Sequence, residues 1–135
     1  MVVVSAVICI KLDSRLYHRG REILVRLAKR HGVPLRQSYA RVGTKALRLA
    51  SRYAHARQMK RARREIKRLK TYLGRVWRDV RRKLADRPEV AEPFALPLAR
   101  VERLLAQQRT DRNKLYALHA PEVACIAPRA LRDGH

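Results

Sequence analysis

The chain has 135 residues, a net charge of +22 and a pI near 11.5. Hydrophobic residues make up 47% of it, enough to build the core of one domain, so the composition excludes wholesale disorder. The charge favours a polyanionic partner such as DNA, RNA or an acidic membrane surface. The few aromatic residues, one Trp, one Phe and five Tyr, disfavour single-strand binding on stacked aromatic platforms.

The cysteines and the apolar N-terminus predict a cytoplasmic protein. Cys9 and Cys125 are too far apart for a CxxC zinc site and form no disulfide framework. The Val2–Ile10 run is too short to span a bilayer and lacks the basic region of a signal peptide. We therefore expect no export and no membrane partner.

The first third of the chain predicts a strand followed by a helix. Met1–Ile10 is rich in β-branched residues, which favour a short buried strand. Asp13 is suited to cap a helix over Ser14–His31, which Gly32 ends. The apolar face of this helix consists of Leu16, Ile23, Leu24 and Leu27.

A long basic helix, or a helix pair, is predicted over Lys45–Ala85, with Thr44 as its cap. Apolar residues recur at helical spacing on one stripe. They are Met59, Ala62, Ile66, Leu69, Leu73, Val76, Val80 and Leu84. A single helix of this length would reach roughly 60 Å, too long for a compact domain of this size. We therefore expect either a bend, for which Gly74 is the obvious position, or packing against a second long helix.

The C-terminal third predicts one more helix. Asp86–Pro97 contains three prolines and ends the long helix, and Pro97 suits the first turn of a helix over Leu98–Gln108. This helix is expected to pack antiparallel on the Ile66–Leu84 part of the stripe. Val123–Ile126 is a second short strand candidate. The predicted fold is mainly α, with short flanking strands.

The opposite face of the long helix is cationic. Arg57–Lys83 holds 13 Lys and Arg against two acids, a net +11 and half of the charge of the whole chain. Eleven of these side chains are predicted to contact phosphates. They are Arg57, Lys60, Arg61, Arg64, Lys67, Arg68, Lys70, Arg75, Arg78, Arg81 and Arg82. Trp77 is assigned to the core, whereas the roles of the tyrosines at 39, 53 and 72 stay open.

No pattern for catalysis or metal binding emerges. The acids are scattered, and Asp79, four residues from both Arg75 and Lys83, has the spacing of surface ion pairs. The five histidines form no HExxH pattern, and nucleotide-binding and nucleophile motifs are missing. We predict no catalytic residues, no metal ligands and no cofactor.

Four phrases nevertheless resemble bacterial transposases of the insertion sequence 5 family. They are DSRL at Asp13–Leu16, LVRLAKRHGVPLRQSYARVG at Leu24–Gly43, SRYAHARQMKRARREIKRLKTYLGRVWRDV at Ser51–Val80 and LLAQQRTDRNKLYALHAPEVACIA at Leu104–Ala127. The resemblance implies a DDE transposase with an RNase H-like fold, in which three acids hold two divalent metal ions such as Mg²⁺ for DNA cleavage and joining. The matched stretch resembles the helical insert that separates the catalytic strands of that family.

The catalytic positions have no counterparts here. Where the family has a strand carrying its first catalytic Asp, this chain has VVVSAVICI, and it departs from the family again at Pro128. We therefore expect residues 1–12 to be a leader unlike the family, 13–127 to be the helical transposase-like region, and 128–135 to be a divergent tail. The Asp/Asp/Glu triad and its metal site are not expected.

The predicted function is that of a truncated insertion-sequence transposase. It would be a DNA-binding helical part of the transposition and recombination machinery of a transposable element, without strand-transfer activity on its own. The alternative is a helical interaction module that pairs, through the Ile66–Leu84 stripe, with itself or with a full-length transposase. A basic RNA-binding or ribosome-associated protein is a third option that rests on charge alone.

Overall fold

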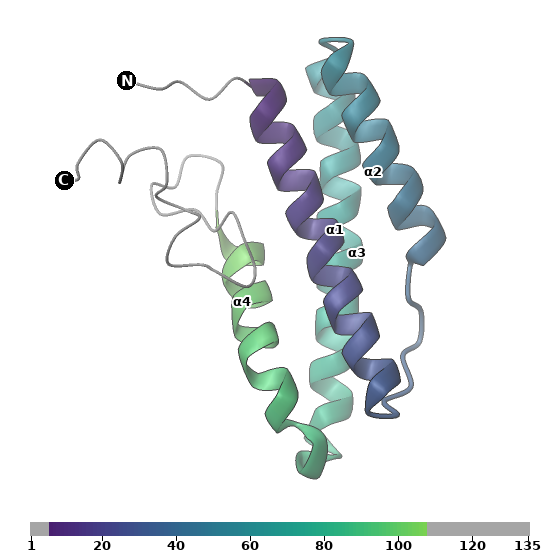
Figure 1. The fold of residues 1–135 in the computed structure, drawn as a ribbon, viewed down its shortest axis with the longest axis vertical. Helices are drawn as coiled ribbons and strands as arrows, with labels where there is room; N and C mark the ends of the chain where they lie inside the picture. Colours follow the sequence, from purple (N-terminus) through teal and green to yellow (C-terminus); the bar gives the residue numbers. More distant parts are fainter. Residues whose placement is uncertain (1–5, 108–135) are drawn as a thin grey trace, which may run out of the picture.

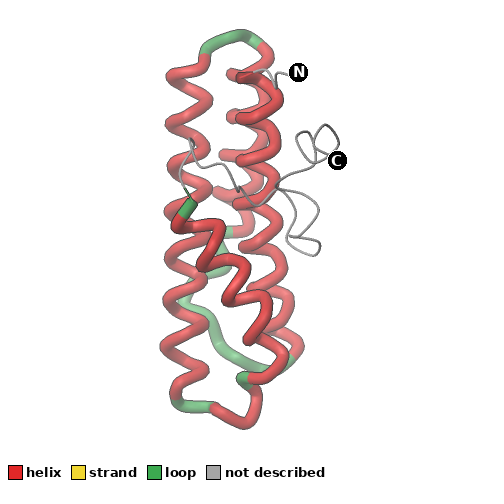
Figure 2. The backbone as a smooth tube through the Cα atoms, turned by 90° about the vertical axis from the view of Figure 1, so that its left-hand side faces the viewer, coloured by secondary structure: helices red, strands yellow, loops and turns green. Residues whose placement is uncertain are grey.

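The structure, a computed structural model, describes residues 6–107, which form an elongated helical bundle (Figure 1). Its helices are α1 (Ala6–Arg30), α2 (Ala40–His55), α3 (Met59–Ala85) and α4 (Ala95–Ala106). Two short 3-10 turns join α3 to α4, η1 (Pro88–Val90) and η2 (Glu92–Phe94). Over the described residues the backbone consists of helices and loops only, as Figure 2 shows. The prediction of a mainly α fold is confirmed.

The first three helices run alternately down, up and down, and each of them contacts the other two (Figure 1). The shorter α4 returns antiparallel to α3 and packs against both α1 and α3. Gly20 of α1 allows this close approach, because a Cβ there would lie 3.2 Å from Leu73 Cδ1 and 3.5 Å from Val101 Cγ2. The core is the space that these helices enclose.

The apolar stripe of α3 lies in that core. Of its eight residues, Ala62, Leu69, Leu73, Val76, Val80 and Leu84 are buried, and the other two, Met59 and Ile66, are half-buried. Helical spacing therefore identified the buried face correctly. Because α1, α2 and α4 cover this stripe, it is not exposed for pairing with another chain in this fold.

The predicted N-terminal strand is wrong for the part that the structure describes. Residues 6–10 belong to α1, so Asp13 lies inside a helix and does not cap one. Ile10 packs with Ala54 of α2 and Ala62 of α3, and this burial outweighs the strand preference of a β-branched run. Residues 1–5 and the strand candidate Val123–Ile126 lie outside the described residues.

The long basic helix is a helical hairpin, as one of the two alternatives predicted. The chain turns at Ala56–Gln58, where Arg57 adopts a left-handed backbone with φ of 62°. Gly74 is buried in an unbroken α3, so a bend there is wrong. Thr44 is also no cap, since it lies inside α2 and its hydroxyl donates to the carbonyl of Ala40 at 2.8 Å.

The remaining helix ends also differ from the predictions, most at the start of the first helix. The first helix extends from Ala6 to Arg30, where Ser14–His31 was expected. The last begins at Ala95, three residues before the predicted start, and Pro97 occupies its first turn as expected. None of the helices between residues 6 and 107 combines the length and the apolarity needed to cross a bilayer.

Candidate nucleic-acid interface

The outward face of α3 carries a row of exposed cations, which we call the α3 basic row. It consists of Lys60, Arg64, Lys67, Arg75, Arg78 and Arg82, all of them exposed. These positions follow helical spacing on the side opposite to the buried stripe, so burial of the stripe directs them to solvent. At 1.5 Å per residue, the row extends over roughly 33 Å.

The charges of this row have no ion-pair partner among residues 6–107. In the described part of the chain, the structure shows ion pairs at Glu22, Glu65 and Asp79, and none of these pairs involves the row. Arg75 lies 5.9 Å from the ring centre of Tyr39, a cation–π contact that keeps its charge. The row is therefore available to a polyanion.

The other five predicted phosphate contacts flank the row. Arg57 is exposed in the α2–α3 turn, and Lys70 is half-buried. The remaining three are engaged with other side chains. Arg61 contacts Tyr53 at 5.9 Å, Arg68 pairs with Glu65 at 3.2 Å, and Arg81 lies 4.7 Å from the ring centre of Trp77. Among the described residues, the row thus has no ion pairs, although Arg75 contacts an aromatic ring as Arg61 and Arg81 do, whereas Arg68 of the flanking set is paired with a carboxylate.

The two carboxylates on α3 have structural partners. Glu65 is 5% exposed and pairs with Arg68, and Asp79 is 8% exposed. Of the two ion pairs that the spacing of Asp79 predicted, the one with Lys83 forms, but the carboxylate is buried and not at the surface. Its Oδ2 accepts the backbone N–H of Arg36 at 2.8 Å, and its Oδ1 lies 3.5 Å from Nζ of Lys83. Arg75, the other expected partner, lies over Tyr39.

The transposase resemblance implies a divalent metal site, and the side chains of the described residues do not form one. Among residues 6–107, no group of three or more His, Cys, Asp or Glu side chains lies close enough together to hold a metal ion. Two of the acids already have partners: Glu65 pairs with a cation, and Asp79 pairs with a cation and accepts a backbone N–H. This part of the chain does not fit such a site, and we derive no chemical step through a metal.

The aromatic residues of α3 and its neighbours are mainly structural. The indole N–H of Trp77 donates to the carbonyl of Leu98 at 3.0 Å, so Trp77 joins α3 to α4, in agreement with its assignment to the core. Tyr39 and Tyr72, left open by the sequence, stack with ring centres 5.1 Å apart. Tyr53 packs against the small cluster around Ile10.

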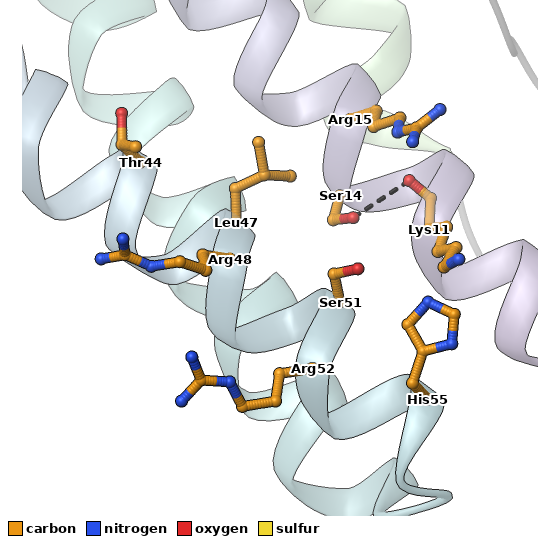
Figure 3. A pocket seen from close by; sticks show the side chains of 9 residues that line it. All are labelled: Lys11, Ser14, Arg15, Thr44, Leu47, Arg48, Ser51, Arg52 and His55. Atoms are coloured by element: carbon orange, nitrogen blue, oxygen red, sulfur yellow. Dashed lines mark hydrogen bonds between the residues drawn. The ribbon is translucent and has the colours of Figure 1, made fainter.

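A second cationic feature, the α1–α2 groove, was not found from the sequence. It is an open pocket of about 440 Å³ between the first two helices (Figure 3). Its lining residues are Lys11, Ser14, Arg15, Thr44, Leu47, Arg48, Ser51, Arg52 and His55. The available signal was a pair of cations four residues apart on each helix, Lys11 with Arg15 and Arg48 with Arg52. It was missed because the groove exists only where α1 and α2 pack side by side, which spacing along one helix does not show.

Further along α1, beyond the residues that line the groove, the helix carries a buried cation. Arg21 is 3% exposed, donates to the carbonyl of Ser38 at 3.0 Å, and lies 3.3 Å from Nδ1 of His18. Burial lowers the pKa of Arg21, and Glu22 opposes this shift. Burial also lowers the pKa of His18, with a further contribution from Arg21, whereas Glu22 raises it. On the same helix, burial and then the charge of Asp13 raise the pKa of Tyr17 to about 12.

Comparisons with known proteins add little to these observations. No family model matches the chain, and no solved structure matches it significantly. Over 46 residues, which are 34% of this chain, it is 59% identical to an uncharacterized protein of Rhizobium meliloti, ORF8 in the nfe locus. The match spans 22% of that protein, whose name states no activity. The resemblance to insertion sequence 5 transposases therefore stays a prediction.

Proposed function

We propose that this chain binds duplex DNA through the α3 basic row and works in insertion-sequence transposition. One observation carries the proposal. Six exposed cations follow one helix face over roughly 33 Å without ion pairs to the described residues. Lys and Arg side chains on such a face contact phosphates and position a protein on DNA without reading its bases. The phrases shared with transposases supply the biological setting.

The expected signature is a steep salt dependence. If the six side chains each neutralise one phosphate, the slope of log K against log salt is about −5. Affinity then falls by about 10³-fold between 50 and 200 mM salt. A duplex of about 20 base pairs is a suitable probe, because the row spans roughly ten at 3.4 Å per base pair.

The test compares two triple variants by fluorescence anisotropy with that duplex. Arg64→Ala/Lys67→Ala/Arg78→Ala removes three cations of the row and is expected to make the slope shallower by about 3. Arg26→Ala/Lys29→Ala/Arg30→Ala removes the same charge from exposed positions of α1. Equal slopes for the two variants would mean that net charge alone governs binding, and the α3 interface would be wrong.

A role as an interaction module that pairs through the Ile66–Leu84 stripe receives no support from this fold. Leu69, Leu73 and Val80 of that stripe are each at most 1% exposed. Among the described residues, the large apolar side chains that are exposed are Ile8, Val42 and Leu96, and they lie on three different helices. The predicted lack of strand transfer by this chain alone stays a prediction, to be tested with duplex DNA and Mg²⁺.

A further inference from the structure

The α1–α2 groove and the α3 basic row lie on opposite sides of the bundle. In Figure 1, α1 and α2 lie in front and α3 lies behind them. The buried stripe of α3 faces α1 and α2, so the basic row faces away from both. The groove between α1 and α2 opens on the near side, with α3 behind it (Figure 3).

The groove is lined by Leu47, by the aliphatic parts of cationic side chains, and by hydroxyl and charged groups, with no carboxylate among its lining residues. Arg15, Arg48 and Arg52 are exposed at its rim, and Lys11 is half-buried. Figure 3 shows Lys11 and His55 near each other at one end of the groove. Lys11 and the three arginines of the groove form no ion pair with the described residues.

One hydroxyl at the centre of the groove remains able to donate. The hydroxyl of Ser14 donates to the carbonyl of Lys11 at 3.0 Å, and that of Thr44 donates within α2. Ser51 lies across from Ser14, and its hydroxyl has no such bond to residues 6–107 (Figure 3). A phosphodiester group offers only acceptor oxygens, which suit a hydroxyl, guanidinium groups and an ammonium group.

Helix packing alone does not account for this charge. Close packing of α2 is explained by its small buried residues, Gly43, Ala46, Ala50 and Ala54. Cations four residues apart on one helix repel each other, and both helices carry such a pair here. The helix dipole favours Arg52 and His55 in the last turn of α2, but it gives no such benefit to Lys11 and Arg15. An anion in the groove would relieve the repulsion.

We propose that the α1–α2 groove is a second phosphodiester site, through which one chain holds a second DNA segment while the α3 basic row holds the first. The bridging part of this inference rests on the proposed function of the row. The two surfaces face away from each other, so two duplexes bound to them do not compete for space. The chain therefore bridges DNA segments.

The experiment measures bridging and simple binding separately. A biotinylated duplex is held on streptavidin beads, the chain is added, and capture of a second, fluorescent duplex is recorded. Arg48→Ala/Arg52→Ala is expected to reduce this capture to the level of beads without protein. The same variant should bind a single duplex with the affinity of Arg26→Ala/Lys29→Ala, which removes equal charge from outside both surfaces. Ser51→Glu, which places a carboxylate at the centre of the groove, should also abolish capture.

The outcomes separate the groove from the row. Capture that survives both groove variants would overturn the proposal and would indicate bridging by a pair of associated chains. Loss of single-duplex binding in the α3 triple variant, with no capture even by the wild-type chain, would support the row and overturn the groove. Normal single-duplex binding by the α3 variant, together with its loss in the groove variants, would place the DNA in the groove and overturn the α3 proposal instead.

Discussion

The carboxylate of Asp79 accepts the backbone N–H of Arg36, with 2.8 Å between Oδ2 and N. These residues lie 43 positions apart, and the bond ties α3 to the loop that joins α1 to α2. Two further side chains of the same end of the molecule donate to that loop, Lys83 to the carbonyl of Pro34 and Arg87 to that of Gly32. The loop contains no regular structure, so these three bonds, together with the bond from Arg21 to the carbonyl of Ser38, hold its path.

Asp79→Ala is therefore expected to destabilise the fold by about 1–3 kcal/mol, because it leaves a partly buried N–H without an acceptor. Asp79→Asn should cost less, since the amide oxygen can still accept. Urea denaturation measures both. Asp86→Ala is the matched control, because Asp86 is exposed at the end of α3 and its removal changes the charge equally. A loss in Asp79→Ala no larger than in this control would contradict the role of Asp79.

Two glycines inside helices should respond in opposite ways to alanine. A Cβ at Gly43 would lie 2.9 Å from Nε of Arg21, whose buried guanidinium is held by the carbonyl of Ser38. A Cβ at Gly74 would lie 3.2 Å from Nη1 of Arg78, which is exposed and free to move. We expect Gly74→Ala to stabilise α3 by about 0.5–1 kcal/mol.

Gly43→Ala should destabilise the protein by up to about 2 kcal/mol, because overpacking costs about 1–3 kcal/mol and the higher helix propensity of Ala offsets about 1 kcal/mol of that. Thermal unfolding of the two variants, each against the wild type, is the measurement. A gain in stability at position 43 equal to that at position 74 would show that Arg21 is not held in place.

These glycines also explain why the sequence misplaced the helix boundaries. Glycine normally marks turns, but Gly43 and Gly74 lie within helices, where the missing Cβ leaves room for an arginine. The real turn contains neither Gly nor Pro, and it depends on a left-handed backbone at Arg57. The apolar stripe and the basic face of α3 were predictable, because both follow from spacing along one helix. The α1–α2 groove was not, since it requires the pairing of two helices.

The stability of the fold should depend on pH through His18. Burial and the nearby Arg21 lower the pKa of His18 from 6.5, so the unfolded chain takes up a proton at a higher pH than the folded chain does. Stability is therefore highest above about pH 6.5 and falls as the pH is lowered through the folded pKa. His18→Gln should flatten this decline, since Gln carries no charge and can still accept from Arg21.

The measurement is the free energy of unfolding between pH 7.5 and 5.5, at constant ionic strength because of the high net charge. His55→Gln is the control, since His55 is exposed at the end of α2. An identical pH dependence in the wild type and His18→Gln would show that His18 does not contribute.

Geometry also ranks the eleven predicted phosphate contacts. Arg64 and Arg78 belong to the α3 basic row and have no ion pair, whereas Arg68 is already paired with Glu65 and Lys70 is half-buried. A cation that must leave a carboxylate gains less from a phosphate than a free one does. In single alanine variants titrated with DNA over 50–200 mM salt, we expect Arg64→Ala and Arg78→Ala to make the slope of log K against log salt shallower by about 0.9 each. Arg68→Ala and Lys70→Ala should change it clearly less. Equal effects at all four positions would mean that DNA responds to the total charge of α3 and not to the side of the helix on which a cation lies.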